Sequence, residues 1–292
     1  MKDARLADSP RLTDPRSAAT VGRIPPLRAS IESTASVRAA PRIEVAGATH
    51  VGMRRAHNED NLLLLEEQQV YVVADGMGGH ASGEVASQIA VEEMASFYLR
   101  THRDRDATWP YRMDGSRDYE ENRLAMAVRL ANLRIHELAH TEQRYQKMGT
   151  TLVAMAFCGG EVRVAHVGDS RAYRLRQGVL TQLTEDHSLL NDYIRSKKLT
   201  PEEIERFPHK NVIVRALGMA EDVKVDLRRE AISPGDQYLL CSDGLSGMLQ
   251  DPAIAHLMGS AQNLSDAVQR LIDAANQAGG QDNVTAVVAG IY

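Results

Sequence analysis

The chain has 292 residues, 43% of them hydrophobic and 25% charged, and its formal net charge is −5. This is the composition of an ordinary globular protein. Its only two cysteines, Cys158 and Cys241, form no C-x-x-C pair, which excludes a disulfide scaffold and favours a reducing, cytoplasmic location. Apolar runs such as 62–65 and 284–291 are shorter than the roughly 18 residues that indicate a membrane span, so no membrane association is expected.

Residues 1–42 differ from the rest of the chain. They hold eight Lys/Arg against four Asp/Glu and five prolines, with no sustained hydrophobic period. This pattern predicts a disordered basic leader. Because the segment has no aromatic side chain to stack on bases, nucleic-acid binding is not expected. A catalytic or binding domain is therefore expected to span residues 43–292.

Short apolar runs at 43–46, 61–65 and 70–74 predict three strands at the start of this domain. Two long helical patterns follow, with apolar residues at Val85, Ile89, Met94, Phe97 and Tyr98 and then at Leu124, Val128, Leu133, Ile135 and Leu138.

Strand-like runs then return at 151–157, 162–167, 172–175 and 179–183. A polar helical stretch at 188–207 predicts a small flap, placed at about residues 187–214. The last expected elements are strands at 223–227, 237–242 and 284–291 and a helix at 264–275. Strands grouped in hairpins and separated by long helices indicate one α+β domain rather than alternating βαβ units.

Four aspartates lie where the predicted strands meet glycine: Asp75 before Gly76, Asp169 after Gly168, Asp243 before Gly244, and Asp282 after Gly280-Gln281. Strand ends bring distant residues together, and carboxylate oxygens are the ligands that Mg²⁺ and Mn²⁺ prefer. A single Asp-Gly pair is more often a hairpin turn. Their ordered repetition favours a metal site.

Residues 76–81 also fit the G-x-G-x-x-A dinucleotide fingerprint, but Asp75 would place a negative charge beside a pyrophosphate. The glycine spacing of a phosphate-binding P-loop recurs at 78–83, yet Glu84 stands where that loop needs lysine. Neither cysteine has an arginine six residues later, the spacing of cysteine-dependent phosphatases.

Arg55 precedes the acidic triplet Asn58-Glu59-Asp60, and its planar fork suits a phosphate group, although a solvated surface arginine is the commoner case. His57 and His80 flank the same cluster. A lone histidine is more often structural than catalytic.

Together these residues resemble the metal-dependent Ser/Thr protein phosphatases of type 2C in their compact bacterial form. The resemblance runs from Ala46 to the C-terminus, and seven motifs occur in family order, at residues 52–60, 75–80, 148–151, 167–171, 183–188, 242–244 and 282–283.

The resemblance implies two Mn²⁺ or Mg²⁺ ions bridged by Asp75, with the Gly76 carbonyl on one ion and Asp243 and Asp282 on the other. It implies that Asp169 holds a third, weaker ion. Arg55 would hold the substrate phosphate, and Glu59 would act through metal-bound water.

Met77 occupies the position at which the eukaryotic enzymes carry the histidine proposed as general acid, which leaves His80 as a candidate for that role. The family fold is an α-β-β-α sandwich of two antiparallel sheets flanked by helices.

The implied activity is hydrolysis of phosphoserine and phosphothreonine on proteins by direct attack of a metal-bridging hydroxide. The expected partners are phosphorylated proteins, including Ser/Thr kinases and their substrates, and a monomer is expected. A catalytically silent module that sequesters phosphoproteins is the rival hypothesis, and a dinucleotide-binding protein is a third. Residues 100–119, with Trp109-Pro110-Tyr111 in a charged stretch, are either a partner-contacting insertion or an ordinary surface loop.

Overall fold

The computed structural model describes residues 41–78, 82–104, 108–197 and 212–292. Predictions about the leader up to residue 40, about His80 and about the middle of the flap lie outside these ranges. Residues 40–292 form one compact unit. Within the described ranges, no helix is both long and apolar enough to cross a lipid bilayer.

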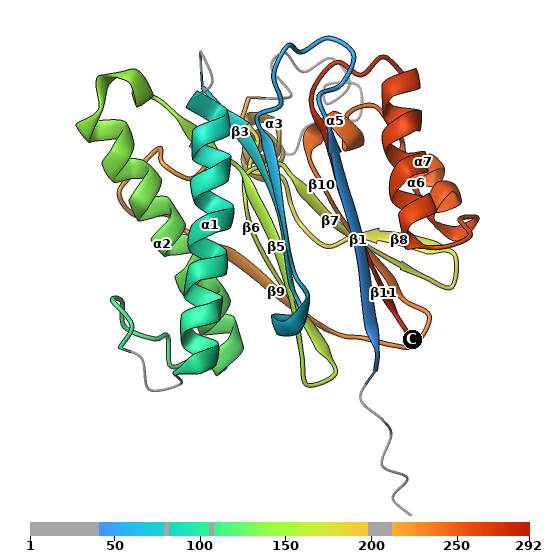
Figure 1. Ribbon diagram of the computed structural model, residues 1–292, viewed down its shortest axis with the longest axis horizontal. Helices are drawn as coiled ribbons and strands as arrows, with labels where there is room; N and C mark the ends of the chain where they lie inside the picture. Colours follow the sequence, from blue (N-terminus) through green and yellow to red (C-terminus); the bar gives the residue numbers. More distant parts are fainter. Residues whose placement is uncertain (1–40, 79–81, 105–107, 198–211) are drawn as a thin grey trace, which may run out of the picture. The chain divides into compact units, whose positions relative to one another are not determined.

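Two antiparallel sheets form the centre of this unit (Figure 1). The first sheet has five strands, in the order β1 (Ile43–His50), β11 (Val284–Ile291), β10 (Gln237–Cys241), β7 (Arg171–Arg176) and β8 (Val179–Gln182). The second has the order β2 (Asp60–Leu65), β3 (Val70–Met77), β5 (Leu152–Cys158), β6 (Glu161–Val167) and β9 (Asp226–Ala231), and the short β4 (Gly149–Thr150) pairs with β3.

Helices cover the outer faces of both sheets. The second sheet is covered by α1 (Ser82–Arg103) and α2 (Tyr119–Thr141), and the first by α5 (Asp243–Ser246), α6 (Asp251–Gly259) and α7 (Leu264–Gln277). Figure 1 shows these two groups of helices on opposite sides of the sheets. The remaining helical elements of the described ranges are η1 (Glu66–Gln68), η2 (Gln143–Tyr145) and α3 (Leu189–Lys197). The expected α+β sandwich is confirmed.

Strand β3 illustrates why the apolar runs of the sequence are continuous rather than alternating. Val70 and Val72 pack in the cluster shared with α1 and α2, whereas Tyr71 and Val73 pack in the cluster between the two sheets. Successive side chains of a strand point to opposite faces, and here both faces are buried. The central strands, which are buried on both faces, therefore support the loops that follow their ends.

Helix α2 begins at a capping box. The Asp118 side chain accepts a hydrogen bond from the Glu121 N–H at 2.7 Å, and the Glu121 carboxylate accepts one from the Asp118 N–H at 3.1 Å. Such a cap satisfies backbone donors that the first helical turn leaves without partners. The helix start is therefore fixed by local sequence as well as by packing.

The strand expected at 223–227 is wrong in its position, because β9 covers Asp226–Ala231. Pairing of β9 with β6 ends at the pair of His166 and Asp226, just before β6 itself ends and turns at Gly168. Val223 and Val225 instead bury their side chains in the cluster that contains α2. Helix α6, which has Pro252 in its first turn, was not expected.

Candidate metal centre

Two carboxylates meet where β2 begins and β3 ends. Asp60 and Asp75 are directly opposite each other in the antiparallel register, so their side chains lie on the same face of the sheet. Like charges in such a pair destabilise the fold unless something neutralises them. Asp60 is 4% exposed, and its Oδ1 has no hydrogen-bond partner in the described part of the chain.

Two further carboxylates come from the first sheet. Asp243 opens α5 directly after β10, and Asp282 precedes β11. The strands β10 and β11 are neighbours in the sheet, with Cys241 paired to Ala286, so these two acidic segments leave the same edge together. Asp169 lies in the turn between β6 and β7 and is 7% exposed.

The glycines that accompany these aspartates allow close backbone approach. A Cβ on Gly76 would lie 2.1 Å from the Gly83 carbonyl oxygen, and one on Gly244 would lie 1.9 Å from the Asn283 carbonyl oxygen. Neither glycine has a positive φ. Close packing of loops from different strands, rather than a hairpin turn, therefore explains these two Asp-Gly pairs.

Asn283 joins the loop before β2 to the start of β11. Its side chain accepts a hydrogen bond from the Glu59 N–H at 2.8 Å and donates to the carbonyl oxygens of Val51 and His57, each at 2.9 Å. This loop carries Arg55, whose Nη2 lies 2.6 Å from Asp282 Oδ2. Asn283 therefore brings Arg55 and Glu59 to the acidic cluster.

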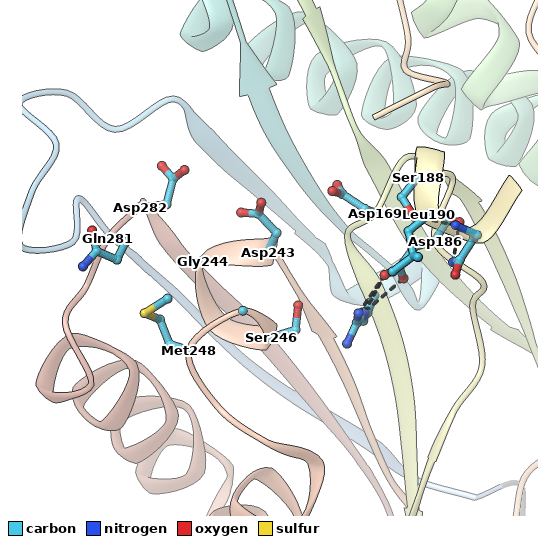
Figure 2. A pocket seen from close by; sticks show the side chains of 13 residues that line it. Asp169, Asp186, Ser188, Leu190, Asp243, Gly244, Ser246, Met248, Gln281 and Asp282 are labelled. Atoms are coloured by element: carbon cyan, nitrogen blue, oxygen red, sulfur yellow. Dashed lines mark hydrogen bonds and ion pairs between the residues drawn. The ribbon is translucent and has the colours of Figure 1, made fainter. Parts of the chain in front are cut away.

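A cavity of about 390 Å³ opens at this cluster and is lined by Asp169, Asp243 and Asp282 (Figure 2). Its other wall includes Asp186, which forms a bidentate ion pair with Arg171, with the closest contact at 2.7 Å. That pair neutralises its own charges. Among the described residues, the three aspartates have no such partner, apart from the contact between Asp282 and Arg55.

Desolvation and mutual repulsion raise the pKa values of the clustered carboxylates. Burial raises the pKa of Asp60 and of Asp169 to about 7 each. Desolvation, followed by the charges of Asp60, Asp243 and Asp169, holds the pKa of Asp75 well above its usual range. Desolvation and Asp282 likewise raise the pKa of Asp243. A cluster of this kind is ionised only with difficulty unless cations neutralise it.

The donor set fits a hard divalent cation. It consists of carboxylate oxygens, and two of these, Asp60 Oδ1 and Asp169 Oδ1, are buried without a hydrogen-bond partner among the described residues. Buried polar atoms without partners are uncommon in folded proteins, and an ion is one explanation for them. Mg²⁺ and Mn²⁺ prefer oxygen ligands of this type.

Two residues of this site were not assigned from the sequence. Asp60 is one of them, although it belongs to the acidic triplet that drew attention to Arg55 and Glu59. The other is His187, which lies in the expected motif at residues 183–188. His80 lies outside the described residues, and Met77 lines a separate cavity with Met148 and Met219.

His187 holds the turn that carries Asp169. The ring nitrogen Nδ1 of His187 accepts a hydrogen bond from the Gly168 N–H at 3.0 Å, and the backbone N–H of His187 donates to the Gly168 carbonyl oxygen at 2.9 Å. The other ring nitrogen, Nε2, lies 3.1 Å from Asp226 Oδ2. The ring of His166 stacks on that of His187 at 4.7 Å.

His166, His187 and Asp226 have ligand atoms within 4.8 Å of one another, a spacing that could hold a metal ion. However, Arg215 Nη1 lies 2.8 Å from His187 Nε2 and 3.3 Å from Asp226 Oδ1. A guanidinium already supplies the positive charge there. We therefore interpret these residues as a structural clamp on the Gly168 turn and not as a second metal site.

Comparisons with known proteins agree with this geometry. The sequence model of the protein phosphatase 2C family matches residues 46–288. The serine/threonine phosphatase stp of Listeria monocytogenes is 37% identical over 247 residues, which cover 82% of this chain and 92% of that protein.

Solved structures lead to the same family. The serine/threonine phosphatase PstP/Ppp of Mycobacterium tuberculosis aligns with a TM-score of 0.73 and 37% identity, covering 85% of this chain and 98% of that one. The catalytic domain of PstP in complex with 2 manganese ions aligns with a TM-score of 0.71 and 36% identity, covering 86% and 99%.

Proposed function

The chain belongs to the protein phosphatase 2C family, and on that premise we propose that it is a Mn²⁺- or Mg²⁺-dependent protein serine/threonine phosphatase. It hydrolyses phosphoserine and phosphothreonine on proteins, releasing the hydroxyl side chain and inorganic phosphate. The observation that carries this proposal is the convergence of Asp60, Asp75, Asp169, Asp243 and Asp282 at the ends of five segments, without enough cations among the described residues to neutralise them.

We assign the carboxylates unequal roles. Asp75, the Gly76 carbonyl, Asp243 and Asp282 would hold two divalent ions. Asp169 would hold a third, weaker ion. The assignment is supported by the central position of Asp75, whose pKa is raised by burial and then by the charges of the other aspartates. Such ions, when bound, supply Lewis acidity and an activated water, which the very slow hydrolysis of phosphate monoesters requires.

Arg55 is suited to hold the substrate phosphate. Its side chain is 50% exposed and paired with Asp282, so the guanidinium can reach a ligand without losing a buried partner. Its fork geometry allows two parallel hydrogen bonds to phosphate oxygens.

Glu59 is positioned at the same site through Asn283. Desolvation raises its pKa, which brings this carboxylate closer to the range in which it can exchange protons with water at neutral pH.

The biological setting is part of the proposal. Phosphorylated Ser/Thr kinases and their substrates are the proposed partners, the protein acts as a monomer, and it acts in the cytoplasm. The two unpaired cysteines are compatible with a reducing compartment. The catalytic domain spans residues 43–292, a division supported by the family match at 46–288 and the compact unit at 40–292.

Phosphate release from a phosphoserine peptide tests the activity directly. The purified chain should turn over only with Mn²⁺ or Mg²⁺ and should stop when EDTA removes the metal. An inert, metal-loaded protein across several phosphopeptides would refute the proposal. The Asp243→Asn variant separates an enzyme from a sequestering module. For an enzyme, the folded variant should lose turnover and still bind phosphopeptide. For a sequestering module, the substitution should leave the cellular function unchanged.

The ranking of Asp169 below the other ligands has its own test. Asp169→Asn should lower turnover roughly 10- to 100-fold, the usual range for substitutions around a metal site. Calorimetry should still detect the two tighter ions. Loss of all metal binding in this variant would contradict the assignment.

A further inference from the structure

A second cavity, away from the acidic one, is lined by four cationic side chains and one carboxylate. It lies between α2, the segment before α2 and residues 223–225, has a volume of about 230 Å³, and shares no lining residue with the cavity at the carboxylates. Its charged lining residues are Arg112, Arg117, Arg129, Lys224 and Asp114, a formal balance of +3. The whole chain carries −5, so this concentration of positive charge is local.

The cations of this cavity are incompletely satisfied. Arg112 forms no hydrogen bond or ion pair with any residue that the structure describes. Arg129 pairs with Asp222 through Nη2 at 2.7 Å and stacks on Tyr111, yet its buried Nε has no partner in the described ranges. Leaving a buried N–H without an acceptor costs free energy, so the Nε–H of Arg129 can accommodate an additional acceptor.

The other two cations make only long ion-pair contacts within the part of the chain that the structure describes. Arg117 Nε lies 3.4 Å from an Asp114 oxygen, and Lys224 Nζ lies 3.6 Å from Asp226 Oδ1. Both pairs are partly exposed, and long, solvent-accessible pairs of this kind contribute little energy. They can therefore turn toward a bound anion at small cost.

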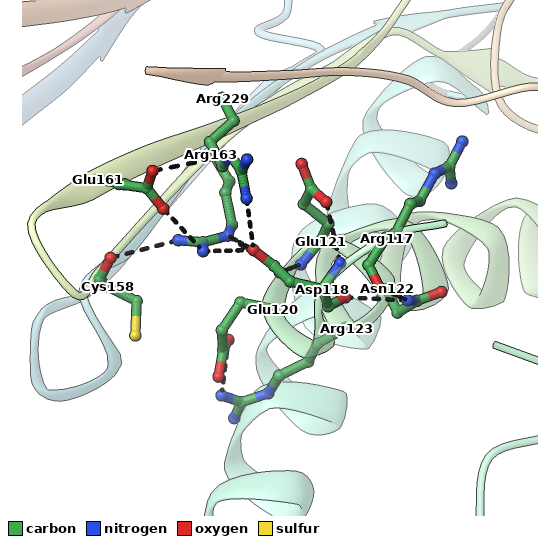
Figure 3. Close-up of polar contacts among 10 residues, drawn as sticks. All are labelled: Arg117, Asp118, Glu120, Glu121, Asn122, Arg123, Cys158, Glu161, Arg163 and Arg229. Atoms are coloured by element: carbon green, nitrogen blue, oxygen red, sulfur yellow. Dashed lines mark hydrogen bonds and ion pairs between the residues drawn. The ribbon is translucent and has the colours of Figure 1, made fainter. Parts of the chain in front are cut away.

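The segment that carries Arg112 and Arg117 is held in place before any ligand arrives. Asn122 in α2 accepts a hydrogen bond from the Asp114 N–H at 2.7 Å and donates to the Asp114 carbonyl oxygen at 3.0 Å. Asp118, the residue after Arg117, forms ion pairs with Arg163 and Arg229 at 2.6 and 3.2 Å (Figure 3).

Figure 3 also shows that Arg117 extends away from this ion-pair network. Asp118 thus occupies Arg163 and Arg229, while Arg117 stays available to the cavity. A site whose cations are placed in advance loses less conformational entropy when an anion binds.

From this geometry we infer that the cavity is a second phosphate-binding site, separate from the site of hydrolysis. Arginine forks match the several oxygens of a tetrahedral oxyanion better than a single point charge would. One water takes about 30 Å³ of liquid volume, so the cavity can hold one phosphate group with part of its hydration shell.

Two sources supply this group. One is free inorganic phosphate, the product of the proposed reaction, and the other is a second phosphorylated side chain on a protein substrate. The second source rests on the proposed function, whereas binding of phosphate itself does not.

Trp109 provides a readout that does not depend on catalysis. It is the only tryptophan of the chain, lies three residues before Arg112, and packs against Phe97 and Tyr119 at centroid distances of 5.6 and 5.2 Å. Its fluorescence should therefore respond when the adjacent segment binds an anion.

The test titrates the Mg²⁺-loaded full chain with inorganic phosphate, with a peptide that carries a nonhydrolysable phosphonate analogue of phosphoserine, and with a matched glutamate peptide. We expect a saturable fluorescence change with phosphate. The double variant Arg112→Gln/Arg117→Gln should weaken this binding about tenfold or more, the effect of losing one to two charge-assisted hydrogen bonds. Calorimetry should count one phosphate fewer per chain.

Matched variants separate the two sites. Arg134→Gln removes an exposed arginine from the same helix outside the cavity and should leave the affinity unchanged. Arg55→Gln should leave the Trp109 response intact. Unchanged turnover of p-nitrophenyl phosphate by the double variant would show that its metal centre and fold are preserved.

Binding of phosphate alone would identify the free ion as the ligand, and binding of the phosphonate peptide as well would identify a phosphorylated segment. The inference is overturned if neither probe gives a saturable signal in fluorescence or calorimetry. It is also overturned if the double variant binds as tightly as the wild type, or if the glutamate peptide binds at least as tightly as phosphate. A catalytically inactive chain that still shows the Arg112-dependent signal would refute the proposed function and leave this site standing.

Discussion

At the scale of single residues, the main feature is a set of carboxylates that oppose folding in the absence of metal. Asp60 faces Asp75 across a strand pair, and Asp243 and Asp169 add repulsion. None of these four carboxylates forms an ion pair with a cation of the described residues, and in the cluster only Asp282 does so, with Arg55. Such groups are retained for function at a cost in stability.

Asp243→Asn should therefore have opposite effects on activity and on stability. Turnover should be lost, because the amide carries no charge for a divalent ion. The metal-free protein should become more stable, on the order of 1 kcal/mol, because one repelling charge is removed from the cluster. Urea unfolding in EDTA measures this free energy.

The matched control is Glu137→Gln, which removes an exposed carboxylate from α2 and should change stability by less than about 0.5 kcal/mol. A less stable Asp243→Asn protein in EDTA would contradict the view that repulsion dominates at this position.

At the scale of elements, the site depends on turns that bring loop backbones into contact. The turn from β10 into α5 passes so close to Asn283 that residue 244 has no room for a side chain. Strand ends alone would leave the two aspartates on separate loops. The close approach at Gly244 is what places Asp243 next to the segment that carries Asp282.

Gly244→Ala should consequently destabilise the fold by about 3 kcal/mol, the upper range for overpacking a tight site. Gly115→Ala is the matched control, because a Cβ there would meet no atom within 4 Å. Thermal unfolding of both variants in saturating Mg²⁺ measures the difference. Equal melting temperatures would show that the turn can relax and that its glycine is not required.

The clamp formed by His187 predicts a pH dependence at the same scale. Desolvation lowers the pKa of His187 to about 4, so the folded state keeps the ring neutral. An unfolded histidine has a pKa near ~6.5 and takes up a proton as the pH falls. Stability contributed by neutral His187 is therefore fully present above about pH 6.5 and is lost as the pH falls toward about 4.

The stability difference between wild type and His187→Gln should accordingly be larger at pH 7 than at pH 4.5 in urea unfolding. His102→Gln, at an exposed position, serves as the comparison. If the difference between wild type and His187→Gln is the same at both pH values, the ring does not titrate as described.

At the scale of the whole molecule, metal binding and folding are linked through the same carboxylates. The pKa values of Asp60 and Asp169 are raised to about 7 in the metal-free fold, well above those of unfolded carboxylates. Between about pH 4 and 7 these carboxylates therefore bind more protons in the folded state than in the unfolded state, and their contribution to metal-free stability falls as the pH rises through this window. A divalent ion that binds the deprotonated carboxylates reverses this loss.

The rise in melting temperature on replacing EDTA with saturating Mg²⁺ should therefore be larger at pH 8 than at pH 5.5. His187 contributes equally with and without metal, so it cancels in this difference. Calorimetry at pH 6.5 should show proton release on Mn²⁺ binding. A metal effect that does not depend on pH would mean that these carboxylates are already ionised in the metal-free protein.

Much of the fold was predictable because its signals are local. The apolar runs of β3, β5, β6 and β11 and the periodic faces of α1, α2 and α7 lie within a few residues of where the sequence predicts them. The strand expected at 223–227 was misplaced because buried valines on a helix-facing segment show the same alternation as a strand. The first paired residue of β9 is set by where its partner strand β6 ends, and the local sequence does not contain this information.

The sequence alone determined the class of chemistry, because the order of aspartates, glycines and Arg55 along the chain is a property of residue type and spacing. The tertiary structure decided what those residues meet. It placed Asp60 opposite Asp75, gave His187 its hold on the Gly168 turn, and gathered the cations beside α2 around one cavity. Each of these depends on contacts between segments far apart in the chain, which no local pattern encodes.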